Sequence, residues 1–334
     1  MLFNWRLLIP FLLLLIGSGY GHAQIQVNKE QQQAYEKVFL LQFDEAEKLL
    51  QGLDSTDCNI AVNYHIKDFI DFLKTFISEK DYNERLSRRN ERIRFWKNLP
   101  DNSPYKNYFI GDSYLRWALI SVKFNNEFQG AIEFRKAYLW LKENDEKFPE
   151  FWPSNADFEI ARVLLGTIPN QYKWIINLIN MKGVENPDEG IENIDISFQQ
   201  IMNSEQFSHL QTPILFMHAF MQLNVNFFDY NQILQLLDKY LNRRQVSNQP
   251  LFVFLYANIL QKQHNSAEAL EILSAYQPDS NTTYPFYFLN YMKGKALMHQ
   301  LDGRCVDEFK TYIHHFKGKN HIKGAYQKWA WYEL

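Results

Sequence analysis

Small residues recur twelve positions apart in segments whose larger apolar residues follow a helical period. The pairs are Ala34 and Ala46, Ala118 and Gly130, and Ala257 and Ala269, followed four positions later by Leu50, Phe134 and Leu273. In two antiparallel helices joined by a turn, such positions lie where the helices cross, and only small side chains let the backbones approach closely. The spacing therefore predicts repeated helix pairs.

The apolar period, with proline and glycine as boundaries, predicts helices over most of the chain. They cover residues 31–41, 43–50, 60–77, 112–124, 129–142, 155–165, 174–181, a stretch that ends near 202, 214–223, 230–241, 251–261, 267–276, 286–299, 306–316 and a helix that starts near 322. Asp112 or Ser113 is suited to cap the helix that starts there. Small residues of later first helices recur at spacings of 38, 37 and 36, at Ala219, Ala257, Gly294 and Ala330. We therefore expect an all-α solenoid of antiparallel helix pairs.

A charge-rich stretch from 79 to 97 interrupts the apolar pattern. Arginines stand there among acidic residues, at Arg85, Arg88, Arg89, Arg92 and Arg94. Interleaved charges are typical of a solvated helix face, which is our expectation, and the alternative is a basic patch for an acidic partner. The net charge of −3 is spread through the chain and offers no general attraction for nucleic acid or an anionic membrane.

The first 23 residues have the pattern of a signal peptide. Arg6 precedes an apolar run from 7 to 16, and Gly21 and Ala23 suit signal peptidase, so that Gln24 begins the mature chain. The run is half the length of a membrane span, which needs about 20 apolar residues. We expect an exported protein in the periplasm or at the cell surface, with no integral membrane span.

Residues 24–334 are expected to form one helical repeat domain, with a sub-boundary near 183–190. The sequence ends within the helix that starts near Ile322, where Ala330 holds a first-helix position. Because an unpartnered repeat exposes its apolar face, we expect the natural protein to continue past Leu334; the alternative is a helix that caps the solenoid.

The composition fits a folded chain with large side chains between its helices. Apolar residues make up 46% of it and aromatic residues 16%, which we interpret as core packing between helix pairs. Cys58 and Cys305 would lie near opposite ends of an elongated solenoid. A disulfide needs alpha carbons within about 7 Å, so two buried free thiols are expected.

These residues resemble tetratricopeptide repeat proteins, most strongly over 112–142 and 251–330. The middle departs from that pattern at 166–169 and 180–190. The segment 164–169, with Trp174, 181–183 and Gly190, is similar to the family of the yeast inclusion-body clearance protein and the animal tetratricopeptide repeat protein 39. Similar exported proteins occur in Bacteroidetes-type bacteria. The resemblance implies an α-solenoid that holds other proteins, and it brings no catalytic residue or cofactor.

The strongest hint of an enzyme is the segment from Gly111 to Leu115, which resembles the nucleophile block of GDSL-type esterases. Its Ser113 would need a preceding strand, for which 108–110 is the candidate, and a later Asp-x-x-His base, which the chain lacks. His314, His315 and His321 do not have the spacing of a metal site. We therefore expect neither catalysis nor a bound metal or other cofactor.

Aromatic and basic residues on first helices are the candidate binding residues, because aromatic and arginine side chains often anchor interfaces. They are Tyr114, Arg116, Trp117, Tyr287, Tyr291 and Lys293. First helices line the concave side of such a solenoid, so the sequence predicts a scaffold that binds a peptide or partner protein in that groove. The alternatives are a glycan-binding component of an outer-membrane uptake system and, more weakly, the esterase; the aromatic residues could also belong to the core.

Overall fold

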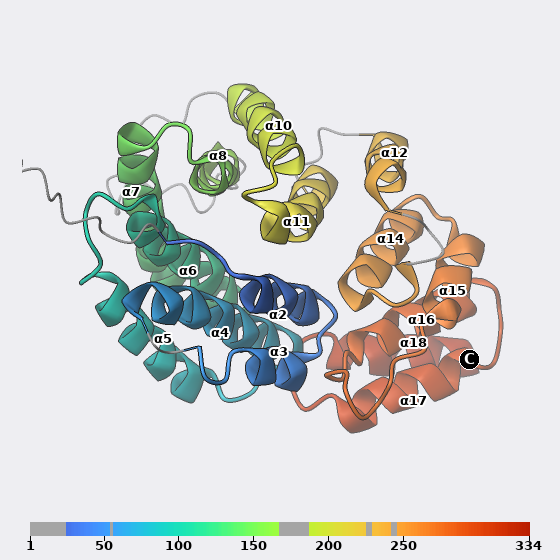
Figure 1. The fold of residues 1–334 in the computed structure, drawn as a ribbon. Coiled ribbons are helices and arrows are strands. Elements are labelled where there is room, and N and C mark those ends of the chain that lie inside the picture. The colour runs from blue at the N-terminus through green and yellow to red at the C-terminus, as the bar shows by residue number, and fades with distance from the viewer. Residues whose placement is uncertain (1–24, 54–55, 167–186, 225–228, 242–245) are drawn as a thin grey trace, which may run out of the picture.

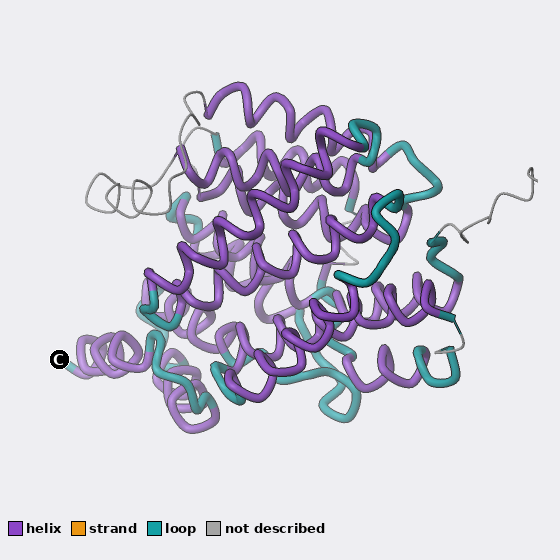
Figure 2. The backbone as a smooth tube through the Cα atoms, turned by 90° about the vertical axis from the view of Figure 1, so that its left-hand side faces the viewer, coloured by secondary structure: helices purple, strands orange, loops and turns teal. Residues whose placement is uncertain are grey.

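The computed structural model describes residues 25–53, 56–166, 187–224, 229–241 and 246–334, and the regular elements of these residues are all helices (Figures 1 and 2). This confirms the predicted all-α class. In chain order the helices are α2 (Lys29–Phe39), α3 (Phe43–Leu49), α4 (Asp57–Ser78), α5 (Tyr82–Trp96), α6 (Pro104–Lys123), α7 (Glu127–Lys147), α8 (Trp152–Gly166), α10 (Pro187–Met202), the short 3-10 helix η3 (Ser208–Leu210), α11 (Gln211–Asn224), α12 (Tyr230–Tyr240), α14 (Pro250–Lys262), α15 (Ser266–Ala275), α16 (Phe288–His299), α17 (Cys305–His315) and α18 (Ile322–Glu333).

Sequential helices pack as pairs, and the small residues lie where they cross. Ala118 on α6 is buried, and a Cβ added to Gly130 on α7 would lie 3.3 Å from its carbonyl oxygen. On α16, a Cβ at Gly294 would lie only 2.7 Å from the ring of Phe309 on α17. The twelve-residue spacing therefore identified real helix crossings. Ala330 differs, since it is exposed and Ala325 is the buried small residue of α18.

The helix pairs follow one another as in a solenoid, but the two halves of the chain meet, so the row of pairs curves back on itself and is not elongated. The backbone N–H of Tyr284, before α16, donates to the carbonyl oxygen of Leu41, after α2, at 2.8 Å. The backbone N–H of Lys319, between α17 and α18, donates to the Glu79 carboxylate at 2.7 Å. In Figure 1 the helices from α6 round to α17 accordingly form an arc that returns to α3 and α4.

Helix α2 lies inside this arc rather than at one end of it (Figure 1). Asn28 and Gln31 form a capping box that fixes its first turn. Its Phe39 ring contacts rings of both halves, with centroids 5.8 Å from Phe69 on α4 and 6.4 Å from Phe252 on α14. The N-terminal helix therefore packs on the concave side of the other helices.

The arginines of α5 are largely buried, which overturns the prediction of a solvated face. Arg89 pairs with Glu133 on α7, and the two side chains are only 2% and 5% exposed. Arg92 lies 2.8 Å from Asp71 on α4. Glu84 of α5 pairs with the half-buried Arg88, but the acidic partners of the buried Arg89 and Arg92 come from α7 and α4. These ion pairs join three helices, and the alternative of a free basic patch has no support.

Helix α6 begins earlier than predicted. Pro104 occupies its first turn, where a missing N–H costs nothing, and Ser103 is the N-terminal cap residue. Asp112 and Ser113 are therefore inside the helix and cap nothing. Residues 108–110, the candidate strand of an esterase, are helical as well.

Some expectations fall elsewhere. The predicted signal peptide, the helix at 174–181 and the first half of the 183–190 loop lie outside the described residues, and residues 187–190, predicted as loop, belong to α10. Cys58 and Cys305 are not joined in a disulfide, as expected, although Cys58 is only half-buried while Cys305 is buried. Among the described helices, none combines the length and the apolar character needed to cross a membrane.

The crossing of α16 and α17 can be tested with Gly294→Ala. Because the new Cβ would clash with the buried Phe309 ring, we expect the free energy of unfolding in urea to fall by about 1–3 kcal/mol. Gly303→Ala is the control, since its Cβ would meet only the Tyr332 hydroxyl at 3.4 Å. Equal losses in the two variants would contradict this account.

The buried ion pair of α5 and α7 can be tested with Arg89→Met. Removing one partner leaves the Glu133 carboxylate buried and uncompensated, so the free energy of unfolding should fall by about 3–5 kcal/mol. The exposed Arg94 on the same helix provides the control, Arg94→Met, with an expected change within about 0.5 kcal/mol. Adding Glu133→Leu to Arg89→Met should recover part of the loss; no recovery would count against the pairing.

Candidate functional site

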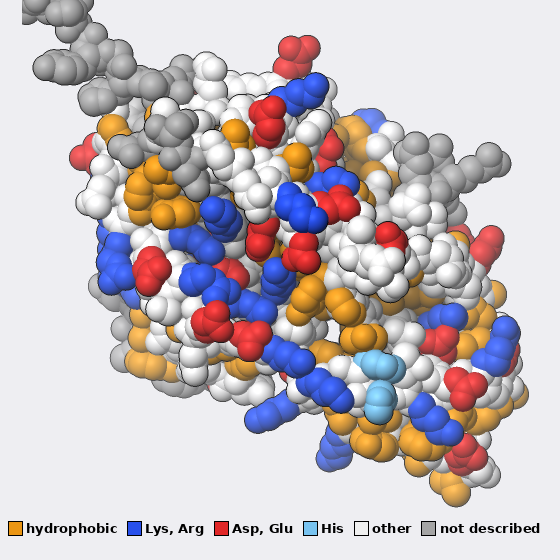
Figure 3. Space-filling view, turned by 60° about the horizontal axis from the view of Figure 1, so that its bottom comes forward, with side chains coloured by type: hydrophobic (Ala, Val, Ile, Leu, Met, Phe, Trp, Pro, Cys, Tyr) orange, Lys and Arg blue, Asp and Glu red, His pale blue; other side chains and the backbone are white. Residues whose placement is uncertain are grey.

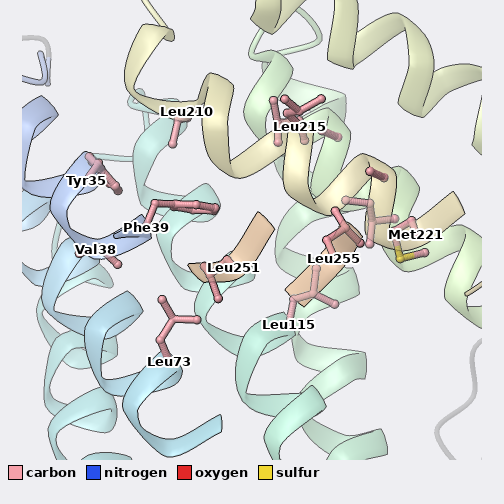
Figure 4. Packing of buried hydrophobic residues seen from close by; sticks show 14 of the residues in the cluster. Tyr35, Val38, Phe39, Leu73, Leu115, Leu210, Leu215, Met221, Leu251 and Leu255 are labelled. Atoms are coloured by element: carbon pink, nitrogen blue, oxygen red, sulfur yellow. The ribbon is translucent and has the colours of Figure 1, made fainter. Parts of the chain in front are cut away.

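The inner sides of the helices leave a cavity of about 760 Å³. This volume is in the range of small-molecule sites, about 300–1,000 Å³. In Figure 4, side chains of α2, α4, α6, α11 and α14 project toward this interior, with Phe39, Leu73, Leu115, Met221 and Leu251 among those labelled. Figure 3 shows hydrophobic side chains gathered around a hollow in one face, with Lys and Arg side chains nearby.

Two parallel rows of side chains, on α4 and α6, form one wall of the cavity. Their spacing of three, four and seven residues places them on one face of each helix. The rows are His65, Phe69, Phe72, Leu73, Phe76 and Glu79 on α4, and Tyr108, Asp112, Leu115, Arg116, Leu119 and Lys123 on α6. Polar residues therefore lie at both ends of each row, and apolar residues lie between them. At 1.5 Å per residue, the α6 row runs for about 16 Å from Asp112 to Lys123.

Phenylalanines of α11, α14 and the segment at the start of α16 form the facing wall. They are Phe216, Phe220, Phe254, Phe286 and Phe288, and neighbouring rings have centroids 5.9–6.5 Å apart. Met217 lines the cavity beside them. All five are half-buried rather than buried, although they point inward, because they border empty space. The middle of the cavity is therefore apolar on both sides.

The deep end of the cavity holds a network of buried polar side chains. His65 Nε2 lies 2.6 Å from Asp112 Oδ2, and His65 Nδ1 lies 2.5 Å from the Tyr35 hydroxyl on α2. Burial lowers the pKa of His65, which favours the neutral ring. Its Nε2 also lies 2.9 Å from Arg116 Nη2, so one ring nitrogen contacts both members of the Asp112–Arg116 pair. Arg116 forms an ion pair with Asp112 one turn away.

The network contains one ion pair, between Asp112 and Arg116. Burial works against the Asp112 carboxylate, but the Arg116 guanidinium and the bond to His65 outweigh it and hold the pKa of Asp112 below its usual value. Burial, and then the nearby Asp112 carboxylate, raise the pKa of Asp157 on α8 well above its usual range, which favours its neutral form. Burial lowers the pKa of His209 to about 4. The deep end is therefore polar but close to electrically neutral.

The other end of the cavity opens to solvent at His321, an exposed residue that also lines it. Here Glu79 accepts hydrogen bonds from the backbone N–H of Lys319 and from Asn320 Nδ2, at 2.7 and 2.6 Å. The Lys123 ammonium lies 3.4 Å from the same carboxylate. Lys295 on α16 also lines the cavity near this mouth.

The structure brings two of the six predicted binding residues to the cavity. Arg116 lines its deep part, and Tyr291 lies near its mouth. Tyr114 and Trp117 are on the opposite face of α6, where the Arg89 guanidinium lies 5.0 and 5.4 Å from their ring centroids. These two rings therefore pack around the buried ion pair of α5.

The remaining two predicted residues, on and next to α16, point elsewhere. Tyr287 stacks on His315, with ring centroids 5.1 Å apart. Lys293 pairs with Glu308 on α17 at 2.8 Å. Neither lines the cavity.

Several site residues were not predicted, although their helix was. The apolar run of α4, with Phe69, Phe72 and Phe76, was read only as evidence of a helix, yet its phenylalanines line the cavity. The number of these phenylalanines was the available clue. Three large rings on one face of a helix present more apolar surface than a single neighbouring helix can bury. His65 and Asp157 gave no signal, because their shared partner Asp112 lies 47 and 45 positions away.

The esterase hypothesis gains no support from this geometry. The Ser113 hydroxyl is buried inside α6 and does not line the cavity, and His65 contacts Asp112 rather than Ser113. Over the described part of the chain, no three His, Cys, Asp or Glu side chains are grouped as metal ligands.

Comparison with known proteins gives no relative for this cavity: no protein-family model, curated protein or solved structure matches the chain.

The link across the mouth should be sensitive to acid. Burial raises the pKa of Glu79, but the hydrogen bonds from Lys319 and Asn320 and the charge of Lys123 outweigh it, so its pKa lies below the usual value. A carboxyl with a lowered folded-state pKa stabilises the fold above the unfolded pKa, about 4.3, and the contribution is lost as pH falls through the folded pKa.

We therefore expect wild type to be more stable than Glu79→Gln at pH 7, and the difference to shrink as pH falls below about 4. Urea unfolding at several pH values measures it. Glu271→Gln, at an exposed position on α15, is the control. A difference that stays constant down to acid pH would show that the Glu79 charge does not hold the two halves together.

Proposed function

We propose that this chain is an exported binding protein that holds a ligand with a large apolar part in its central cavity and carries out no catalysis. The observation that supports this most directly is the apolar middle of the cavity, which is lined on two sides by half-buried phenylalanines. Those rings gain contacts only if something occupies the space between them. Burying apolar surface there is worth roughly 25 cal/mol for each Å².

A peptide or partner protein, as the repeat architecture suggests, is one source of such a ligand. Apolar side chains of an inserted segment would contact the phenylalanines. A peptide backbone also needs hydrogen-bond partners, and Asn224 and Asn258 contribute amide groups to the cavity wall.

A glycan is a weaker candidate. Sugar hydroxyl groups need many hydrogen-bond partners, and the middle of the cavity offers aromatic rings and aliphatic side chains instead. At the deep end, His65 is already bonded to Asp112 and Tyr35, and the buried atoms without a hydrogen-bond partner, such as Arg116 Nε and Asp157 Oδ2, are few beside the hydroxyl groups of a sugar.

Filling the cavity tests the proposal. Met217 is a half-buried lining residue on α11, and Met217→Trp would place an indole in the apolar space. The mature chain should bind the neutral fluorescent probe N-phenyl-1-naphthylamine, and Met217→Trp should weaken that binding about tenfold, which corresponds to about 1.4 kcal/mol.

Leu139→Trp is the matched control, because Leu139 is 45% exposed on α7 and does not line the cavity. This variant should bind the probe like wild type. If wild type does not bind the probe, or if both variants bind it equally well, the cavity is not the binding site.

A further inference from the structure

The mouth of the cavity holds a lysine that has no anionic partner. Lys295 lies on α16, is half-buried and lines the cavity. No hydrogen bond or ion pair reaches its ammonium from the described residues. Its neighbours differ in this respect, since Lys123 pairs with Glu79 and Lys293 pairs with Glu308. An ammonium removed from water without a partner is costly, so the position favours an incoming anion.

The charges around Lys295 strengthen that preference. Burial, and then the positive charge of Lys328, lower the pKa of Lys295. Glu79 also lines the cavity at the mouth, but it already accepts bonds from Lys319 and Asn320 besides pairing with Lys123. The mouth therefore has more basic than acidic side chains, and no described acidic side chain forms an ion pair with Lys295.

The apolar rows begin next to this lysine and continue inward. Phe288 and Tyr291 precede it on α16, and the rows of α4 and α6 extend from there to the deep end. The α6 row is about 16 Å long, which suits an extended hydrocarbon chain. At the deep end, Arg116 already forms an ion pair with Asp112, so the ligand's carboxylate is better placed at Lys295.

We propose that the cavity binds a single-chain anionic amphiphile, whose carboxylate lies at the Lys295 ammonium and whose hydrocarbon chain lies between the phenylalanines of α4 and those of the facing wall. This inference rests on the proposed function, because it names the ligand class of the same cavity. The interaction is a charge-assisted hydrogen bond in a half-buried site, and the chain supplies most of the buried apolar surface.

Two ligands of equal chain length separate the head group from the chain. Decanoate and 1-decanol would each be titrated against the mature protein loaded with the neutral probe, below the concentrations at which they aggregate. We expect wild type to bind decanoate about tenfold more tightly than decanol, the size of one charge-assisted hydrogen bond. Lys295→Met keeps the length of the side chain and should remove this preference while leaving decanol binding unchanged.

Lys293→Met is the matched control, because Lys293 is on the same helix, is paired with Glu308 and does not line the cavity. It should retain the preference for decanoate. If decanol binds as tightly as decanoate to wild type, or if Lys295→Met keeps the preference, the assignment of the head group is overturned while the apolar cavity stands. If neither compound displaces the probe from a protein that binds it, the hydrocarbon chain is not accepted and the amphiphile is overturned as well. Failure of the probe itself to bind would overturn the proposed function.

Discussion

The cavity depends on the packing of α2 between the two halves of the chain. The ring of Phe39 lies 5.8 Å from Phe69 on α4 and 6.1 Å from Phe216 on α11, and it also reaches Phe252 on α14. Helix pairs that stack only on their sequence neighbours would leave the concave side open. Because α2 occupies part of that side and touches both halves, the remaining space is a bounded cavity instead of a continuous groove. The best-supported ligand is correspondingly small.

Electrostatics then determine which end of the cavity can receive a charged group. The deep end contains many ionisable residues, but burial lowers the pKa of His65 and raises that of Asp157, which favours the neutral form of each, and Asp112 is paired with Arg116. Such a network makes the interior polar while leaving little net charge, and its bond to Tyr35 also attaches α2 to α4. The mouth differs, since no described carboxylate forms an ion pair with Lys295 there. A cavity whose unpaired positive group lies at its mouth orients a ligand that has an anionic group at one end and an apolar chain at the other.

Much of the fold was predictable because helix pairing is a local property. The spacing of Ala118 and Gly130 reports a crossing between helices that are adjacent in sequence, and a short turn leaves the chain few other ways to arrange them. The predictions that were wrong concerned residues whose partners are distant in sequence. The arginines of α5 were expected to be solvated because their partners Asp71 and Glu133 belong to other helices. The contact between the two halves of the chain was not predicted, because it depends on bonds such as that between Glu79 and Lys319, which are 240 positions apart.

The same reasoning explains why the site was harder to predict than the fold. The high aromatic content was interpreted as core packing, and for rings such as Trp96 and Phe109, both 1% exposed or less, that is correct. Phe72 and Phe220 have the same residue type and the same helical spacing, yet they border empty space. A hydrophobic pattern records which face of a helix points inward, but it does not record whether the facing side chains have enough volume to meet. Whether an inward face becomes core or cavity is decided by the distance between walls, and here α2 and the returning C-terminal helices set that distance.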